Sequence, residues 1–122
     1  MSGIDYIADT NAVVYLLNGN ACMKPYLGRK LGVSVISVME LLSFPEITEA
    51  EDKKIRTFLE CCEILQITED VKESTIQVRR KQRVKLPDAI ISSTAMMYGV
   101  PLITADTGLF NIDGLQVETI KP

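Results

Sequence analysis

The sequence predicts an α/β domain in which helices cover a mainly parallel central sheet. Short apolar segments typical of buried strands alternate with longer segments typical of helices, and this alternation favours parallel strands connected by helices. The 122 residues correspond to a single domain, 1–122, which is large enough to bury a hydrophobic core without disulfides. No repeat, low-complexity stretch or linker divides the sequence further.

The first half of the chain is predicted to contain three strands and three helices. Strands are expected at residues 4–8, 33–36 and 64–67, and helices at residues 11–17, 37–43 and 48–63. The third helix has the clearest start, because Thr48 can cap it and Glu51 stands at the acidic position of a capping box. A turn is expected at residues 18–20, where Asn-Gly-Asn follows the first helix.

The second half begins with a long polar helix, predicted at residues 69–85. An apolar helix is expected to follow from Pro87 to Tyr98, because proline favours a helix start and Gly99 is a stop signal. The last strands are expected at residues 102–104 and 115–117. Ligand sites in parallel sheets lie outside the carboxyl ends of the strands, so residues that follow strands are the first candidates for a functional site.

The amino-acid composition excludes several kinds of active site. The sequence has no histidine, which excludes Ser-His-Asp and Cys-His catalysis and the usual zinc and iron sites. Its three cysteines form neither a disulfide framework nor a C-x-x-C pair, and we expect them to be small apolar filler residues in a reducing cell. Carboxylates without histidine favour hard cations such as Mg²⁺ or Mn²⁺.

The sequence also bears on the cellular compartment. Nothing in it resembles a signal peptide, and no apolar run approaches the roughly 20 residues that span a bilayer. We therefore expect a cytoplasmic protein without a membrane partner. The net charge of −3 argues mildly against a general nucleic-acid coat protein, but it does not exclude an enzyme that gathers its acids in one pocket.

Two aspartates stand at the ends of apolar segments that are predicted to be strands. Asp9 ends the apolar segment Tyr6-Ile7-Ala8, and Asp106 follows the apolar segment at residues 102–105. Each has a structural interpretation, since Asp9 can cap the next helix and Asp106 can belong to a turn with Gly108. Taken one at a time, these structural interpretations are favoured.

Two further acids lie near the starts of predicted helices. Glu40 stands three residues after Ser37, which is the spacing of a capping box, yet its apolar neighbours lead us to expect partial desolvation. Asp88 lies in the first turn of the apolar helix, where the helix dipole favours an acid. It shares a helical face with Ile91 and Ala95, so we expect it to point inward.

Together the four acids predict a metal site. In a parallel sheet, strand ends and the starts of the following helices meet at one edge. Four carboxylates there would raise one another's pKa values unless a divalent cation neutralised them. Such a site would orient water for attack on a phosphodiester, with Asp9 as a ligand and with Thr10 and Asn11 supporting it or contacting a substrate phosphate.

Four blocks of the sequence resemble those of the PIN-domain ribonucleases, in particular the VapC-type toxins of bacterial and archaeal toxin–antitoxin pairs. The blocks are residues 6–11 (YIADTN), 34–41 (SVISVMEL), 86–95 (LPDAIISSTA) and 101–106 (PLITAD) with Phe110. Each block alone is weak evidence, but four in order at suitable separations are specific.

The resemblance implies an α/β/α sandwich and a Mg²⁺- or Mn²⁺-dependent endoribonuclease. It implies that Asp9, Glu40, Asp88 and Asp106 are the catalytic and metal-binding acids and that Thr104 is a supporting hydroxyl. It further implies homodimers and a complex with a cognate antitoxin. Many relatives carry another acid just before the final phenylalanine, whereas this chain has Thr-Gly-Leu at 107–109, so a second metal would bind weakly or not at all.

A run of cations immediately before Asp88 is a candidate contact surface for RNA. Its members, which we call the basic segment, are Arg79, Arg80, Lys81, Arg83 and Lys85. Most such runs are solvated helix faces. In an acidic chain, however, this run forms a local positive ridge next to the proposed site, and such a ridge can hold phosphates in a salt-dependent manner.

Two other interpretations of the sequence remain open. The first is a PIN-like domain that binds RNA or a protein partner without cleavage, and the missing acid before Phe110 is its only support. The second is a carboxylate-based phosphatase or a receiver-like domain. It is disfavoured because residues 9–11 lack the Asp-x-Asp pair usual in phosphatases with an aspartate nucleophile.

Overall fold

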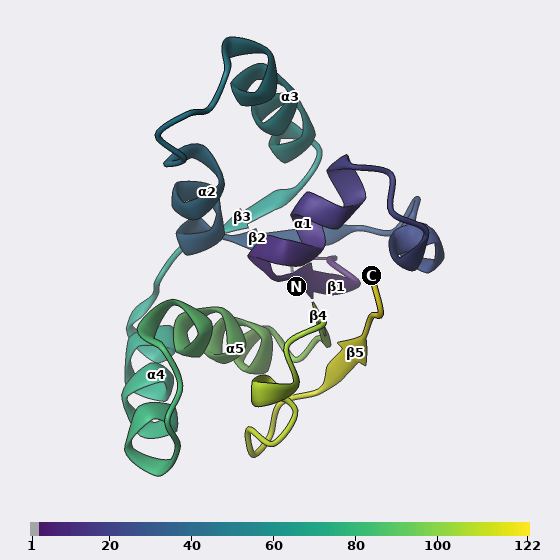
Figure 1. Ribbon diagram of the computed structural model, residues 1–122. Helices are drawn as coiled ribbons and strands as arrows, with labels where there is room; N and C mark the ends of the chain where they lie inside the picture. Colours follow the sequence, from purple (N-terminus) through teal and green to yellow (C-terminus); the bar gives the residue numbers. More distant parts are fainter. Residues whose placement is uncertain (1–2) are drawn as a thin grey trace.

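Within residues 3–122, which the computed structural model describes, five short parallel strands form one sheet in the order β3-β2-β1-β4-β5 (Figure 1). They are β1 (Tyr6–Ala8), β2 (Leu31–Ser34), β3 (Glu63–Leu65), β4 (Leu102–Thr104) and β5 (Val117–Thr119). At the centre of the sheet, Ile7 pairs with Gly32 of β2 and with Leu102 of β4. The sequence-based prediction of a mainly parallel sheet is confirmed.

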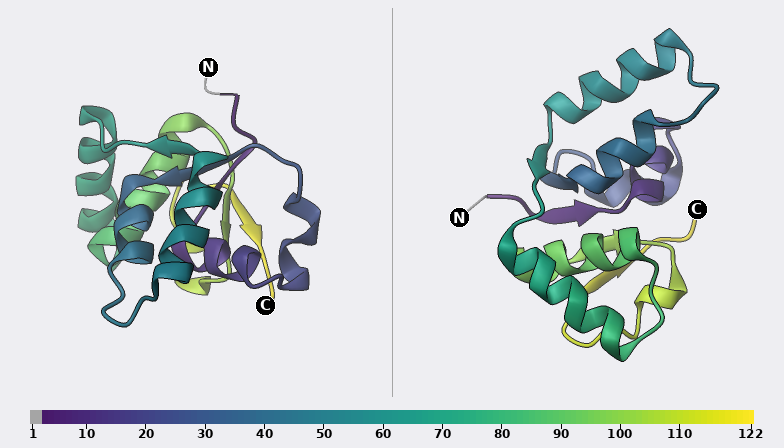
Figure 2. Two further views of the ribbon diagram at one scale, coloured as in Figure 1. Left: turned by 90° about the horizontal axis from the view of Figure 1, so that it is seen from above. Right: turned by 90° about the vertical axis from the view of Figure 1, so that its left-hand side faces the viewer.

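Helices cover both faces of this sheet, as the side view in Figure 2 shows. The helices of one face are α1 (Thr10–Leu17), the 3-10 helix η1 (Ala21–Tyr26), α2 (Val35–Leu42) and α3 (Glu49–Glu60). Those of the other face are α4 (Glu69–Lys81), α5 (Leu86–Tyr98) and the short 3-10 helix η2 (Thr107–Leu109). The layers therefore form the predicted α/β/α sandwich.

Alternation along the strands creates one hydrophobic core on each face. In β1, Ile7 faces the core beneath α4 and α5, whereas the next residue, Ala8, faces the core beneath α1 and α2. In β4, Leu102 and Ile103 divide between the same two cores. All four residues are fully buried, which is the pattern expected for central strands of a parallel sheet.

The strand order reverses between β1 and β4. From β1 the chain continues outward to β2 and β3, and it later returns to β4 and continues in the opposite direction to β5. A crevice at the carboxyl ends of the strands is the usual ligand site at such a point. Asp9 follows β1 directly and Asp106 comes two residues after β4, so both lie at this switch point.

Several sequence-based boundaries are wrong. The second strand was expected at residues 33–36, but β2 ends at Ser34 and α2 begins at Val35. Ser34 caps α2 by accepting from the Ile36 backbone N–H at 3.2 Å, so Ser37 is not the cap and the predicted Ser37–Glu40 capping box does not form. A strand that is buried on both faces has the same apolar sequence pattern as the first turn of an apolar helix. This similarity explains why the boundary between β2 and α2 was predicted too late in the sequence.

The second half of the chain holds two further shifts. The predicted polar helix at 69–85 ends at Lys81, because Gln82 adopts an extended conformation and its side-chain amide donates to the Asn111 carbonyl at 2.8 Å. The last strand lies at Val117–Thr119 rather than at residues 115–117. The Thr48–Glu51 capping box of α3 and the Gly99 stop of α5 are confirmed. Within the described residues, no helix is both long enough and apolar enough to span a membrane.

Candidate carboxylate site

Asp9 is buried at the carboxyl end of β1 and has a structural role. Its carboxylate oxygen Oδ1 accepts from the Ala12 backbone N–H at 2.8 Å and so caps α1, as the structural interpretation of the sequence predicted. Its own backbone N–H donates to the Ile103 carbonyl at 3.1 Å, which ties it to β4. Only 8% of the residue is exposed, and within residues 3–122 no Lys or Arg side chain forms an ion pair with it.

Thr104 connects Asp9 with Asp106. Its buried hydroxyl donates to the Asp9 carboxylate and accepts from the backbone N–H of Asp106 at 3.0 Å. Asp106 is exposed, and its carboxylate accepts from the Gly108 N–H at 2.9 Å in the turn that the sequence indicated. The structure therefore brings Asp9, Thr104 and Asp106 together at the ends of two adjacent strands.

Glu40 reaches the site from α2 through a contact with α1. The hydroxyl of Thr10 donates to Glu40 Oε1 at 2.6 Å, and Ser37 lies 2.8 Å from the same hydroxyl. Glu40 is exposed, so the expectation of partial desolvation is wrong. Its apolar sequence neighbours, of which Leu41 is buried, lie on other sides of the helix.

Asp88 lies in the first turn of α5 and is half-buried. Burial is the main cause that raises its pKa, and the negative charges of Asp106, Glu40 and Asp9 raise it further. Lys85 acts in the opposite direction and lowers it. The expectation that Asp88 points inward agrees with this environment.

The four acids, which we call the carboxylate cluster, come from four separate segments and act on one another electrostatically. Burial raises the pKa of Asp9 most, and the charges of Asp106 and Glu40 add to that effect. The hydrogen bonds from Thr104 and from the Ala12 N–H partly offset it. The ionised forms of Asp9 and Asp88 are therefore disfavoured, first by burial and then by the neighbouring carboxylates.

The donors of the carboxylate cluster fit a hydrated divalent cation. They are oxygen atoms of carboxylates and hydroxyls, which suit Mg²⁺ and Mn²⁺ rather than soft metals. Within residues 3–122 no three Asp, Glu, Cys or His side chains are close enough to hold a metal ion together. Mg²⁺ commonly keeps several waters and binds through one or two carboxylates, so the wider spacing of these acids is compatible with it.

The remaining candidate residues are exposed on the surface. Asn11 is exposed in the first turn of α1. All five cations of the basic segment are exposed, and they continue from the last turn of α4 into the link to α5. Arg79 donates from Nε to the Val84 carbonyl at 3.1 Å, which holds this link against the helix end. Lys85 is close enough to Asp88 to affect its pKa.

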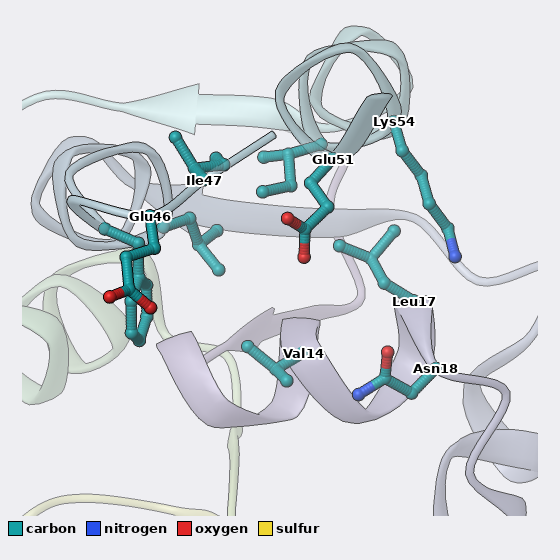
Figure 3. Close-up of a pocket in the computed structure, with 10 residues that line it drawn as sticks. Val14, Leu17, Asn18, Glu46, Ile47, Glu51 and Lys54 are labelled. Atoms are coloured by element: carbon teal, nitrogen blue, oxygen red, sulfur yellow. The ribbon is translucent and has the colours of Figure 1, made fainter. Parts of the chain in front are cut away.

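Two features of this region were missed from the sequence. The first is that Ser37 contacts Thr10 instead of capping a helix. The sequence feature that could have indicated this contact is a polar residue in an apolar helix, three residues before Glu40. The second feature is a cavity of about 440 Å³ between α1, α3 and the segment that links α2 to α3. Figure 3 shows the side chains of Val14, Leu17 and Ile47 around it. None of the carboxylate cluster lines this cavity.

Comparison with solved structures finds the same fold in chains of toxin–antitoxin complexes. A chain of a toxin–antitoxin complex from Klebsiella pneumoniae has a TM-score of 0.81 and 28% identity, covering 94% of this chain and 97% of that one. A chain of VapBC2 from Rickettsia felis, bound to a DNA fragment from its promoter, has a TM-score of 0.81 at 20% identity, with 97% and 100% covered. For VapBC-1 from nontypeable Haemophilus influenzae these values are 0.80 and 21%, with 95% and 98% covered.

The sequence comparisons place the chain in a family. The comparison with curated proteins gave no match. The family described as PIN domain, in contrast, matches residues 6–115, which include all four acids of the carboxylate cluster. On this match the chain belongs to the PIN domain family.

Proposed function

We propose that this protein is a Mg²⁺- or Mn²⁺-dependent endoribonuclease and the toxin of a toxin–antitoxin pair. The observation that carries the proposal is the grouping of four carboxylates from four segments near the switch point of the sheet. There burial, and after it the charges of the neighbouring acids, raises the pKa values of Asp9 and Asp88. Membership in the PIN domain family supports a nuclease, and the matched residues 6–115 include all four acids of the carboxylate cluster.

A Mg²⁺ or Mn²⁺ ion held at this site would serve as a Lewis acid for water activation and for offsetting charge on the phosphate. Asp9 and Asp88 are suited to hold it, because burial and neighbouring charges disfavour their ionised forms without a cation. Thr104 orients the Asp9 carboxylate by donating to it. Glu40 accepts from Thr10 at Oε1, and its exposed carboxylate offers the second oxygen to a water proton.

The substrate is proposed to be RNA, with the basic segment along its path. The five exposed cations of this segment lead directly into α5, and Lys85 lies next to Asp88. Cations in this position can neutralise phosphates on either side of the bond that is cut. Binding through them would weaken as the salt concentration rises.

A cognate antitoxin is the proposed protein partner. The Klebsiella pneumoniae chain comes from a toxin–antitoxin complex, and it shares 28% identity with this chain over nearly the full length of both. Homodimer formation is part of the same proposal, because it follows from the resemblance to VapC-type toxins.

The alternative is a PIN domain that binds RNA or a protein without cleavage. It is favoured by the wide spacing of the acids in the described residues and by the absence of an acid at 107–109. Both features would weaken metal binding and leave the fold intact.

Cleavage of a total RNA pool separates the two functions. The purified protein is incubated with Mn²⁺, Mg²⁺ or EDTA, beside Asp88→Asn and a control, Asp113→Asn, which changes an exposed turn residue outside the cluster. Discrete fragments that require metal and vanish only in Asp88→Asn would support the nuclease. Metal-dependent cleavage retained in Asp88→Asn would contradict the assigned site, and no cleavage together with no Mn²⁺-induced rise in melting temperature would favour the binding function.

A further inference from the structure

Three oxygen atoms join α1 to α2 beside the carboxylate cluster. The hydroxyl oxygen of Ser37 lies 2.8 Å from that of Thr10, and the Thr10 hydroxyl lies 2.6 Å from Glu40 Oε1. Ser37 and Glu40 belong to α2, whereas Thr10 is the first residue of α1 and follows Asp9. Thr10 therefore occupies the middle of a short hydrogen-bonded chain.

Counting protons fixes the direction of this chain. The Thr10 hydroxyl has one proton, and the ionised carboxylate of Glu40 can only accept. The Thr10 proton therefore goes to Glu40, and Ser37 must donate its own proton to Thr10. Hydroxyl bonds to a carboxylate are charge-assisted and stronger than those between two neutral groups, which favours this arrangement over the reverse.

Burial differs sharply along the chain. Ser37 is fully buried, Thr10 is half-buried and Glu40 is exposed. The buried hydroxyls of Thr75 and Thr94 donate within their own helices, each to the carbonyl four residues earlier. Ser37 instead directs its hydroxyl to a neighbouring helix. A rigid, buried donor is thus connected to a side chain that is otherwise free to move in solvent.

We propose that Ser37 is a positioning residue of the carboxylate site, acting through Thr10 to hold Glu40. By donating to the Thr10 hydroxyl, Ser37 keeps the Thr10 proton directed at Glu40. This restricts the rotamers of an exposed glutamate. The position of this carboxylate matters, because Thr10 directly follows Asp9, so the chain of hydrogen bonds connects Glu40 to the segment that carries Asp9. The significance for catalysis rests on the proposed metal-dependent function, whereas the hydrogen-bonded chain itself does not.

The first test uses the metal-free protein and reads the Thr10 side chain directly. Three-bond NMR couplings report whether Thr10 occupies one χ1 rotamer. We expect a single rotamer in wild type and in Ser93→Ala, a control that removes a buried hydroxyl without a hydrogen-bond partner in the described chain. Averaged couplings are expected in Ser37→Ala, and recovery in Ser37→Thr, which restores a hydroxyl. Unchanged Thr10 couplings in Ser37→Ala would overturn the proposal.

Ser37→Cys keeps the test usable if Ser37→Ala does not fold. The thiol has nearly the same size as the hydroxyl but is a weak donor, so we again expect averaged Thr10 couplings. A single Thr10 rotamer in Ser37→Cys would count against the proposal.

The second test is a double-mutant cycle on Mn²⁺ affinity, measured by calorimetric titration. Ser37→Ala should weaken Mn²⁺ binding by about tenfold, the lower end for residues that orient metal ligands. The same change in a Thr10→Val background should cause no further loss, since the connection to Glu40 is already broken. An equal loss in both backgrounds would overturn the proposal. No Mn²⁺ binding by wild type would instead contradict the proposed function and leave the NMR result to decide the role of Ser37.

Discussion

The backbone N–H of Asp106 donates to the hydroxyl of Thr104 at 3.0 Å, while that hydroxyl donates to Asp9. One buried threonine therefore sets the positions of two acids that follow adjacent strands. The arrangement depends on β1 and β4 being neighbours, because only then do Asp9 and Thr104 meet at the sheet edge.

Thr104→Val should raise the pKa of Asp9 further. Burial and the neighbouring acids raise this pKa, and the hydrogen bond from Thr104 lowers it. Without that hydrogen bond the pKa should rise further. We expect a stability loss of about 1 kcal/mol for the lost hydrogen bonds. NMR titration of the Asp9 carboxyl carbon in metal-free protein measures the first effect. Thr104→Ser, which keeps the hydroxyl, is the control, and identical Asp9 titrations in the two variants would contradict the prediction.

The parallel fold and the places of Asp9, Asp88 and Asp106 in it could be predicted from sequence, because local patterns determine them. Asp9 and Asp106 each follow an apolar strand, and Asp88 follows Pro87 at a helix start. These signals require only knowledge of which elements are strands and which are helices. The sheet geometry then brings the strand ends together without further information from the sequence.

The exposure of Glu40 and the role of Ser37 could not be predicted in this way. Ser34 and Ser37 can both cap a helix, and the choice depends on where β2 ends within the sheet. Once α2 begins at Val35, Ser37 turns toward Thr10 and Glu40 toward solvent. Similarly, α4 ends at Lys81 because Gln82 contacts Asn111, a residue distant in sequence. Tertiary contacts set both outcomes.

Thr48→Ala should destabilise the fold without affecting the carboxylate site. Thr48 and Glu51 form both hydrogen bonds of a capping box at the start of α3, at 3.0 and 3.1 Å. Loss of such a cap costs about 1 kcal/mol. Urea unfolding measures the change, and Mn²⁺ titration tests the site. An altered Mn²⁺ affinity in Thr48→Ala would show that α3 is coupled to the carboxylate cluster, contrary to this prediction.

The adjacent cysteines should differ in reactivity. Cys61 is exposed, which contradicts its predicted role as a filler residue, whereas Cys62 is half-buried and packs against the core. Burial raises the pKa of Cys62 to about 11, and the neighbouring Cys61 adds to this effect. Since the thiolate is the reactive form, iodoacetamide at pH 8 should modify Cys61 at least about tenfold faster than Cys62 in native protein. Peptide mass mapping over time measures both rates, and equal rates in native but not in unfolded protein would rule the prediction out.

Asp9→Asn should remove a destabilising charge and retain the helix cap. Burial, followed by the charges of Asp106 and Glu40, raises the pKa of Asp9 in the folded protein. The stability that its proton provides is fully present below the unfolded-state pKa and is lost as the pH rises through the higher folded-state pKa. Ionised Asp9 therefore costs stability at neutral pH. Asparagine lacks this charge, and its side-chain oxygen can still accept from the Ala12 N–H.

Metal-free Asp9→Asn is thus expected to be at least as stable as wild type at pH 7, with any advantage shrinking as the pH falls toward the ordinary carboxyl range. Its response to Mn²⁺ should be the opposite. At a concentration of 100 times the dissociation constant, Mn²⁺ should stabilise wild type by about 2.7 kcal/mol, and Asp9→Asn should lose most of that gain. Urea unfolding at several pH values, with and without Mn²⁺, measures both effects, and Asp113→Asn is the matched control. A large loss of metal-free stability in Asp9→Asn would mean that the Asp9 charge supports the fold, and its role in the site would then have to be separated from that effect.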